Sequence, residues 1–431
     1  MTAYFSIKGS AGARTLEGDI AIVGAKNAAL KAIAASILYQ TPLQLSNVPH
    51  IEDVSRMIDI LREMGGVATF EDHKVSIDMR KLSTTAITPE IAKRLRASIV
   101  LTGPILAREG KVQFPHPGGC VIGERPIDLF IESFLKMGAT IKHVGKFYDI
   151  TAPKDGLRGA DMFFRVASVT GTETFMMTAI LANGTTTIRN AAMEPEIVWL
   201  AEMLNASGAK IEGAGTSTIT IKGIRGKLSQ KGKPFAVVPD RIEAGSFLVL
   251  GAIAAKRLTL THVVPEHLGS LIEMLEYSGI PVERTKDTLT VRAPKKGTVL
   301  RSFNVRTHEY PGFPTDLQAP LMIYLTQTKG ESLVFETIFE GRLNYTESLN
   351  RMGASITMMD PHRVLVKGPT KLNGKRLESP DLRAGLAFVM AAAIASGESE
   401  IHNVYNIDRG YERVEERLRA VGMRITRVSG E

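Results

Sequence analysis

The stretch Leu61-Arg-Glu-Met-Gly65-Gly-Val-Ala68 returns later in the chain as Leu349-Asn-Arg-Met-Gly353-Ala-Ser-Ile356. Both copies run from an apolar helical end through a glycine into alternating apolar and polar residues. Four further copies lie at 135–141, 204–211, 275–282 and 418–425. The glycines at 65, 138, 208, 279, 353 and 422 are separated by 73, 70, 71, 74 and 69 residues. Such a regular step predicts a repeat architecture of six modules.

Each module is expected to be a small α/β unit with two helices. The glycine stands where the end of a helix favours a left-handed residue, and the alternation after it is typical of a strand. Another strand precedes the helix and has an Asn or His near its end, at Asn47, Asn190, His262 and Asn403. The apolar runs 175–182 and 388–395 have the composition of buried helices. Six modules can form one solenoid or two clusters of three.

Length and composition indicate a globular protein of more than one domain. The chain has 431 residues, a length that exceeds what one ordinary core accommodates. Of these residues, 44% are hydrophobic and 23% charged, which is typical of a globular protein. It contains no apolar run long enough to cross a membrane, and its first residues lack the layout of a signal peptide. We therefore expect a cytoplasmic protein without membrane insertion. The single cysteine, Cys120, excludes an internal disulfide and a cysteine-built metal site.

The net charge of +8 suits an anionic ligand, which can be a phosphorylated small molecule or a nucleic acid. Nucleic-acid binders usually combine clustered basic residues with aromatic residues for stacking. Here aromatic residues make up only 6% of the chain, and Lys and Arg are dispersed. The pattern favours a phosphorylated small molecule and predicts no nucleic-acid partner.

The second module contains an unusual loop, Gln113-Phe-Pro-His-Pro-Gly-Gly-Cys120-Val-Ile-Gly-Glu-Arg125-Pro-Ile-Asp128. Its prolines and glycines cannot continue a helix or a central strand, and its glycines allow backbone N–H groups to approach an anion. A cation such as Arg125 near Cys120 favours the thiolate. A lone cysteine is often only a small buried apolar residue, but this setting favours acid–base work or a transient adduct.

Five motifs resemble the family of UDP-N-acetylglucosamine enolpyruvyl transferases, and together they span the whole chain. They are Gly24-Ala-Lys26-Asn27, Arg96-Ala-Ser, Pro-Gly-Gly-Cys120 with Gly-Glu-Arg125-Pro, Phe313-Pro-Thr-Asp316, and Ile407-Asp-Arg409-Gly-Tyr-Glu-Arg. Their combination within six repeats is specific, although each string is short. The Lys-Ser and Gly-Asn-Ala-Gly-Thr strings that are characteristic of the sister enzyme for shikimate phosphate are missing.

The resemblance implies an α/β fold of two globular domains, each built from three modules arranged as an inside-out α/β barrel. One domain would span 26–235 and the other would combine 1–25 with 236–431, with the active site in the cleft between them. The implied enzyme is a transferase that moves the enolpyruvyl group of phosphoenolpyruvate to the 3-hydroxyl of UDP-N-acetylglucosamine and releases phosphate. This is the first committed step of peptidoglycan synthesis. No metal or organic cofactor is implied, and both substrates are small molecules.

The resemblance also assigns site residues. The catalytic residues would be Cys120, Asp316 and Lys26, with Asp316 accepting the proton of the attacking hydroxyl and Cys120 acting as an acid and as the target of the epoxide fosfomycin. Phosphoenolpyruvate would bind Lys26, Arg96, Cys120, Arg125, Arg383 and Arg409, because guanidinium groups match its anionic oxygens. The acceptor would contact Asn27, Arg96, Arg125, Pro126, Ile127, Asp128, Leu129, Ser168, Val169, Asp316 and Ile338.

Four positions depart from the family pattern. Val166 replaces a lysine, Thr170 a glycine and Phe130 a histidine, while Glu124 adds a negative charge to the loop. The loss of two cationic groups weakens diphosphate binding unless other residues compensate, so a different nucleotide or nucleotide-sugar acceptor stays open. Two further functions also stay open, those of a basic RNA-handling protein and of a catalytically inactive paralogue.

Substitution of the thiol tests the role given to Cys120. Because the chain has no second cysteine, Cys120→Ser is expected to abolish covalent labelling by fosfomycin while the protein stays folded. Intact-mass spectrometry after incubation with the epoxide measures this, and circular dichroism checks the fold. Labelling that persists in Cys120→Ser contradicts the assignment.

We also expect Asp316→Ala to remove turnover while the fold keeps its stability.

Overall fold

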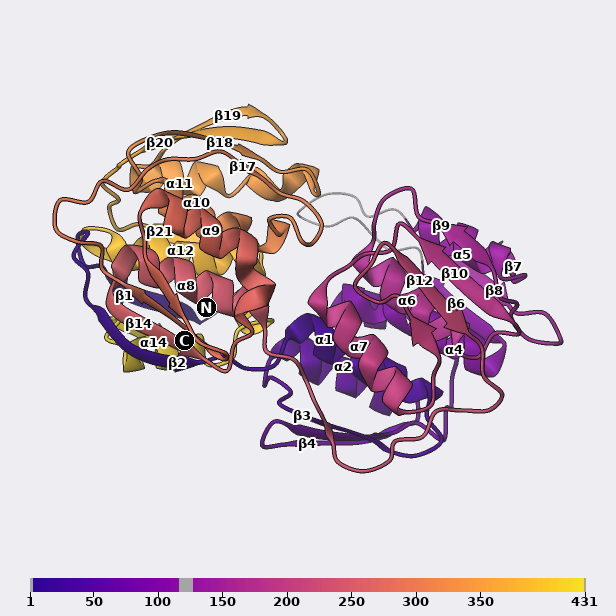
Figure 1. The fold of residues 1–431 in the computed structure, drawn as a ribbon. Helices are drawn as coiled ribbons and strands as arrows, with labels where there is room; N and C mark the ends of the chain where they lie inside the picture. Colours follow the sequence, from indigo (N-terminus) through magenta and orange to yellow (C-terminus); the bar gives the residue numbers. More distant parts are fainter. Residues whose placement is uncertain (1–2, 116–126, 430–431) are drawn as a thin grey trace. The chain divides into compact units, whose positions relative to one another are not determined.

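The computed structural model describes residues 3–115 and 127–429 (Figure 1). The predicted site residues Cys120, Arg125 and Pro126, and the departure at Glu124, lie outside the described residues. The chain divides into two compact units. The described residues before Gly24 and after Val238 form one of them, which we call the N/C unit, and those from Gly24 to Val238 form the middle unit.

All six predicted helix-to-strand turns are present. The repeat glycines have φ between +86° and +109°, the left-handed region that glycine adopts without strain. The helices that precede them are α2 (Glu52–Glu63), α5 (Asp128–Lys136), α7 (Pro195–Ala206), α9 (Gly269–Ser278), α11 (Thr346–Met352) and α14 (Val414–Ala420). The strands that follow are β4 (Val67–Glu71), β7 (Thr140–Val144), β11 (Ile211–Glu212), β15 (Val282–Arg284), β19 (Ser355–Asp360) and β23 (Ile425–Val428). The predicted repeat is therefore confirmed.

The middle unit has three small sheets among its described residues. In spatial order, their strands are β13 (Phe235–Ala236), β3 (Leu43–Ser46), β5 (Lys74–Asp78) and β4; β6 (Lys111–Pro115), β8 (Phe147–Thr151) and β7; and β11, β12 (Thr218–Lys222), β10 (Thr185–Arg189) and β9 (Asp161–Phe163). In the sheet of β6, a parallel bridge between Ala86 and Gln113 takes the place of a fourth strand. The loop predicted from Gln113 onward therefore begins inside β6.

The N/C unit also has three sheets, and the first two strands of the chain complete two of them. In spatial order, their strands are β15, β16 (Thr288–Arg292), β14 (Ala255–Thr261) and β2 (Leu16–Ala21); β17 (Val305–Arg306), β18 (Gly330–Phe335), β20 (Arg363–Gly368) and β19; and β21 (Arg376–Glu378), β22 (Glu398–His402), β1 (Tyr4–Lys8) and β23. β1 lies antiparallel to both neighbours, with Phe5 opposite Ile401 and Arg427. This pairing places the start and the end of the chain in one unit.

Helices fill the centre of each unit. They are α8 (Arg241–Ala254), α10 (Gln318–Leu325) and α12 (Leu382–Ile394) in the N/C unit, and α1 (Lys26–Ala35), α4 (Thr102–Glu109) and α6 (Val169–Ala179) in the middle unit. Every residue of α8 and α10 is buried, and in α12 every residue after Leu382 is buried, as expected for helices that are mostly apolar on all sides. Each unit has its own apolar core. Figure 1 shows α8, α10 and α12 with sheets around them, which confirms the predicted inside-out α/β fold class.

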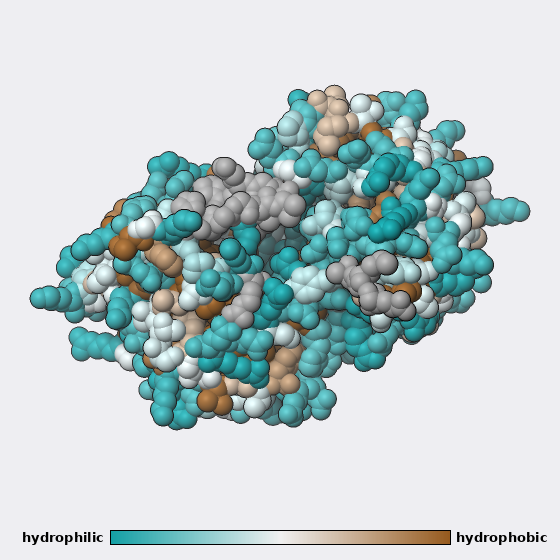
Figure 2. All heavy atoms as spheres, turned by 180° about the vertical axis from the view of Figure 1, so that it is seen from behind, coloured by the Kyte–Doolittle hydropathy of each residue, from teal (hydrophilic) through white to brown (hydrophobic). Residues whose placement is uncertain are grey.

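Short helices complete the description, and the surface is mostly polar. Among the described residues, the α-helices shorter than eight residues are α3 (Pro89–Arg94), α11, α13 (Tyr405–Asp408) and α14. On the face drawn in Figure 2, apolar side chains are scattered among polar ones. Within residues 3–115 and 127–429, no helix has the length and apolar character needed to cross a membrane. The same ranges contain no group of three His, Asp or Glu side chains arranged to hold a metal ion.

One ion pair lies inside the core of the middle unit. Lys31 of α1 and Glu173 of α6 are both buried, and Nζ of Lys31 lies 3.1 Å from Oε2 of Glu173. Burial raises the pKa of Glu173 to about 7; Lys31 opposes this shift, whereas Glu196 and Glu194 add to it. The free-energy cost of burying the ionised Glu173 carboxylate is therefore larger than the favourable interaction of this carboxylate with Lys31.

Glu173→Gln should flatten the pH dependence of stability. Between pH 4.5 and about 7 the folded protein keeps a proton on Glu173 that the unfolded chain has released. The stabilisation from this group is thus fully present below that range and is lost as the pH rises through it. The urea midpoint of the variant should fall less than that of the wild type between about pH 5 and about pH 8. The exposed Glu212→Gln is the control, and parallel curves for Glu173→Gln and wild type contradict the expectation.

Candidate active site

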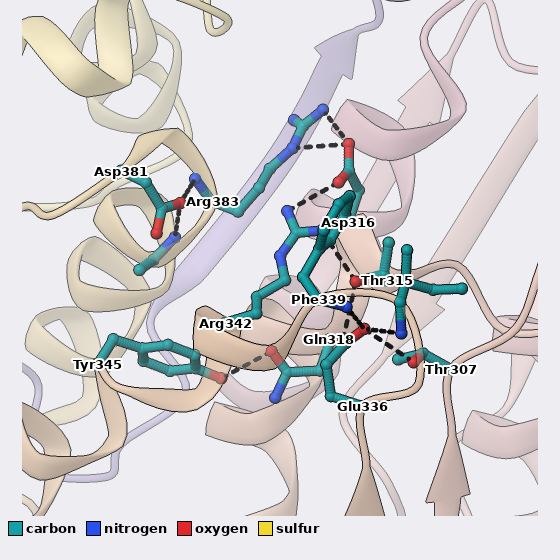
Figure 3. A network of polar contacts seen from close by, with 12 residues as sticks. Thr307, Thr315, Asp316, Gln318, Glu336, Phe339, Arg342, Tyr345, Asp381 and Arg383 are labelled. Carbon is teal, nitrogen blue, oxygen red and sulfur yellow. Dashed lines mark hydrogen bonds and ion pairs between the residues drawn. The ribbon is translucent and has the colours of Figure 1, made fainter. Parts of the chain in front are cut away.

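Asp316 lies in an ion-pair network of the N/C unit (Figure 3). It stands in a short 3₁₀ turn, Thr315–Leu317, that leads directly into the inner helix α10. Nη2 of Arg342 donates to its Oδ1 at 2.8 Å, and Nη2 and Nε of Arg383 donate to its Oδ2 at 2.7 and 3.1 Å. Both guanidinium groups are almost fully buried, whereas 26% of the Asp316 side chain is exposed. The carboxylate is therefore held by two cations but stays accessible.

Glu336 holds the turn that carries Asp316. This buried carboxylate accepts hydrogen bonds from Oγ1 of Thr315 at 2.8 Å and Oγ1 of Thr307 at 3.1 Å. It also accepts from the backbone N–H of Ile338 and of Phe339, as Figure 3 shows in part. These contacts fix the segment that carries the predicted acceptor residue Ile338 against the segment that carries Asp316.

The two arginines control the charge of Asp316. Burial alone would raise the pKa of this carboxyl group, but Arg383 and Arg342 outweigh it and hold the pKa far below its usual range. Burial likewise opposes the charge of Arg383, and Asp316 outweighs it, so that the pKa of the guanidinium is raised. Asp316 is thus ionised at every physiological pH, and it is a weak base as long as both guanidinium groups bind it.

Arg383 and Arg409 belong to one connected structure. Asp381 caps α12 by accepting from the N–H groups of Arg383 and Ala384, which fixes the start of the helix. Nη1 of Arg383 donates to the hydroxyl of the buried Tyr411 at 3.0 Å. Arg409 lies two residues before Tyr411. The N/C unit therefore brings Asp316, Ile338, Arg383 and Arg409 of the predicted site into one region.

The middle unit places its predicted cations at the starts of helices. Lys26 is the first residue of α1, followed by Asn27, and its Nζ lies 3.1 Å from Oδ2 of Asp53 in α2. Arg96 begins the 3₁₀ helix Arg96–Leu101, which packs on α1 and leads into α4. Nη1 of Arg96 is buried and has no hydrogen-bond partner among the described residues. A buried guanidinium nitrogen of this kind is suited to an anionic ligand.

The predicted acceptor residues of the middle unit gather where α5 and α6 begin. Ile127, Asp128 and Leu129 form the start of α5, and Ser168 caps α6 by accepting from the N–H of Gly171 at 3.1 Å. A Cβ atom at Gly171 would lie 2.3 Å from Leu129, so glycine is needed for the close packing of the two helix starts. Ser168 and Val169 therefore lie near Leu129.

The departures from the family pattern have different surroundings. Phe130 is buried, and its ring packs on Phe175, so it serves the core. Val166 is 67% exposed just before α6, where a longer cationic side chain would face solvent. Its neighbour Arg165 is also exposed and pairs with Glu132 at 3.2 Å. A cation is thus present one position away from the missing lysine.

Arg342, Glu336 and Tyr411 are absent from the predicted site although they contact its residues. Arg342 follows Ile338 by only four positions and is one of the few nearly buried arginines in the described part of the chain. An arginine on its own is most often a solvated surface charge, and nothing in the sequence around Arg342 indicates that it meets Asp316. Tyr411 lies within the motif around Arg409, and that position was its one signal in the sequence.

The fold matches solved enolpyruvyl transferases. The enolpyruvyl transferase NikO from Streptomyces tendae has a TM-score of 0.88 at 22% identity, over 100% of this chain and 99% of that one. EPSP synthase from Acinetobacter baumannii has a TM-score of 0.74 at 20% identity, over 99% of this chain and 100% of that one. The fold is therefore that of the enolpyruvyl transferases.

Sequence comparison narrows the relationship. The family model described as EPSP synthase (3-phosphoshikimate 1-carboxyvinyltransferase) matches residues 11–418. UDP-N-acetylglucosamine 1-carboxyvinyltransferase of Solibacter usitatus is 45% identical, over 96% of this chain and 97% of the relative. The protein of the same name from Sulfurimonas denitrificans is 42% identical over 99% of both chains. The chain belongs to the family of UDP-N-acetylglucosamine 1-carboxyvinyltransferases, which confirms the resemblance read from its motifs.

The ion pairs of Asp316 argue against the expectation from the sequence that its removal leaves stability unchanged. Asp316→Asn leaves two buried guanidinium groups without their carboxylate, and we expect it to lower the free energy of unfolding by about 2 kcal/mol. Urea unfolding measures this. Asp19→Asn breaks an exposed ion pair with Arg257 in the same unit and should cost less than about 0.5 kcal/mol. Equal losses in both variants would show that the network adds no stability.

Proposed function

We propose that this chain transfers the enolpyruvyl group of phosphoenolpyruvate to the 3-hydroxyl of UDP-N-acetylglucosamine and releases phosphate. One observation carries the proposal: a partly exposed carboxylate, Asp316, is held by two buried arginines in a chain whose full-length relatives are UDP-N-acetylglucosamine 1-carboxyvinyltransferases. The product serves peptidoglycan synthesis. Both substrates are small molecules, the reaction takes place in the cytoplasm without nucleic acid, and no metal or organic cofactor takes part.

The donor binds through cations. Phosphoenolpyruvate carries a phosphate and a carboxylate, and each matches a guanidinium fork. These contacts come from five cations: Lys26, Arg96, Arg125, Arg383 and Arg409. The unpartnered Nη1 of Arg96 supports this assignment, because a bound anion gives it the hydrogen bond that it lacks among the described residues.

Donor binding also activates Asp316. When an anionic group of phosphoenolpyruvate takes over Arg383, the carboxylate of Asp316 loses one of the two cations that make it a weak base. Arg342, the second cation, is placed to hold the carboxylate in position while it accepts a proton. This exchange sets the order of donor binding and proton transfer, because Asp316 becomes a stronger base only after the donor is bound.

The chemical step is an addition followed by an elimination. The 3-hydroxyl oxygen attacks the carbon that bears the phosphate, and its proton goes to Asp316. The methylene carbon takes a proton from Cys120, which gives a tetrahedral intermediate with a methyl group. The Cys120 thiolate then takes a proton back from that methyl group, which reforms the double bond as the C–O bond breaks and phosphate leaves. Exclusion of water protects the enol during these steps.

The acceptor binds where α5 and α6 begin. The positive ends of these helices suit the diphosphate, and Asn27, Ile127, Asp128, Leu129, Ser168, Val169 and Ile338, with Pro126, contact the nucleotide sugar. Arg165 compensates for the lysine that Val166 replaces, because its exposed guanidinium lies one position away. The shared name of the relatives favours UDP-N-acetylglucosamine over a different nucleotide acceptor.

The assignment requires residues of both units to act on the same substrates. Lys26, Arg96 and the acceptor residues belong to the middle unit, whereas Asp316, Arg383 and Arg409 belong to the N/C unit. We therefore propose two domains of three modules each, with boundaries near residues 26 and 235, and each domain contributes residues to substrate binding.

Phosphate release tests the function. The purified protein is incubated with phosphoenolpyruvate and, in turn, UDP-N-acetylglucosamine, other sugar nucleotides, uridine monophosphate and shikimate 3-phosphate. We expect release with UDP-N-acetylglucosamine and a rate lower by a factor of about 10² or more in Asp316→Asn. Phosphoenolpyruvate should bind Asp316→Asn at least as tightly as wild type, because the carboxylate that competes for Arg383 is gone.

Each contrary outcome has a distinct meaning. Release with a different nucleotide acceptor alone establishes that compound as the acceptor. No release with any acceptor indicates an inactive paralogue, and tight, steeply salt-dependent RNA binding without release indicates an RNA-handling protein. Weaker donor binding by Asp316→Asn contradicts the exchange of Arg383 while leaving the overall function intact.

A further inference from the structure

Arg409 follows a helix that is too short to be stable on its own. Helix α13 (Tyr405–Asp408) has four residues, and its end is closed by the bond from the N–H of Arg409 to the carbonyl of Tyr405 at 3.2 Å. A single isolated turn is unstable in water, because fixing its backbone costs more free energy than one hydrogen bond returns. The position of Arg409 must therefore depend on contacts between α13 and the rest of the N/C unit.

Two of those contacts hold the inner side of the helix. Ile407 is fully buried and packs on α12, where a Cβ atom at Gly385 would lie 2.7 Å from its Cγ1. Nδ2 of Asn406 donates to the carbonyl of Ser379 at 2.8 Å. These contacts fix one side of α13, but neither of them involves Asp408, the residue directly before Arg409.

That residue, Asp408, is held by a distant part of the chain. Arg427 of β23 donates to it through two nitrogens, Nη1 at 2.8 Å and Nη2 at 2.6 Å. The same guanidinium donates to both oxygens of Glu415, at 2.5 and 3.2 Å, and lies 4.9 Å over the ring of Phe5. Arg427 is thus fixed from three sides, and a bidentate pair also fixes the direction of the carboxylate that it holds.

Arg409 therefore lies between two fixed points. Asp408 on one side is bound by Arg427, and Tyr411 on the other is bound by Arg383, which pairs with Asp316. The second connection belongs to the proposed site, whereas the first has no part in the proposed chemical steps. Arg427 brings one positive charge to Asp408 and Glu415, so the cluster does not offer a free cation to an anionic substrate.

We propose that Arg427, acting through Asp408, is a positioning residue for Arg409 and hence for the binding of phosphoenolpyruvate. The inference rests on the proposed function, in which Arg409 holds an anionic group of the donor. Loss of the Arg427–Asp408 pair releases one side of α13 and widens the range of positions that Arg409 occupies. Donor affinity then falls, while the acceptor, which does not use Arg409, binds as before.

Steady-state kinetics of Arg427→Met and Asp408→Asn test the proposal. We expect the KM for phosphoenolpyruvate to rise about tenfold in each, with the KM for UDP-N-acetylglucosamine within about twofold of wild type. The two substitutions change the net charge in opposite directions. A field effect on an anionic donor would therefore weaken binding in Arg427→Met and strengthen it in Asp408→Asn, whereas positioning weakens it in both. The double variant should be no worse than either single one.

Arg424→Met is the matched control. Arg424 directly precedes β23, and its guanidinium donates to the carbonyl of Gly9 at 2.6 Å, away from α13. The control loses the same charge as Arg427→Met and should keep the wild-type KM for phosphoenolpyruvate. Chemical unfolding of all variants shows whether the folded fraction has changed.

Several results overturn the inference. A purely structural role lowers kcat in proportion to the folded fraction and leaves the KM for phosphoenolpyruvate unchanged. A tighter donor in Asp408→Asn means that charge and not position matters. If Arg427→Met does not fold, the KM of Asp408→Asn decides between the outcomes. The fold should tolerate this substitution, because the side chain of Asp408 is only half-buried. Absence of transfer by the wild type refutes the proposed function itself, whereas an active Asp408→Asn with unchanged KM refutes only the role of Arg427.

Discussion

The reversal from an outer helix into a strand constrains the whole molecule. It requires a residue in the left-handed region at the helix end, and the chain supplies glycine there six times, with φ between +86° and +109°. Each reversal ends an outer helix and starts a strand of the surrounding sheet. The remaining helix of most modules is then enclosed, so it must be apolar on every side, as α8, α10 and α12 are. Polar residues are left mainly to its ends.

This constraint explains where the candidate site residues stand. Lys26 and Asn27 open α1, Arg96 opens the turn before α4, and Ser168 caps α6. Asp316 precedes α10, and Arg383 is the second residue of α12. The starts of inner helices carry N–H groups that have no partner within the helix and the positive end of the helix dipole. An anionic substrate and a single carboxylate base both fit such surroundings.

The sequence predicted the features that depend on local chemistry. The step between repeat glycines, the strands that end near Asn47 or His262, and the buried run 388–395 all follow from backbone preferences and apolar patterning, and the structure bears them out. Asp316, in contrast, was predicted as a site residue only because its motif resembles that of the family. Its pairing with Arg342 and Arg383 could not be predicted, because these arginines lie 26 and 67 positions away and meet it only through tertiary packing. These ion pairs also argue against the expectation that the Asp316 variant keeps its full stability. Cys120 and Arg125, predicted from the motif alone, stay predictions.

The pairing of β1 with β22 and β23 has a consequence for how the protein is made. The strands of the middle unit are all synthesised before residue 239, so its core can assemble while translation continues. β1 leaves the ribosome long before its partners β22 and β23, and β2 leaves it long before β14. An unpaired strand is open to aggregation. In the nascent chain, β1 and β2 therefore stay without their partners until the residues of β14, β22 and β23 have been synthesised.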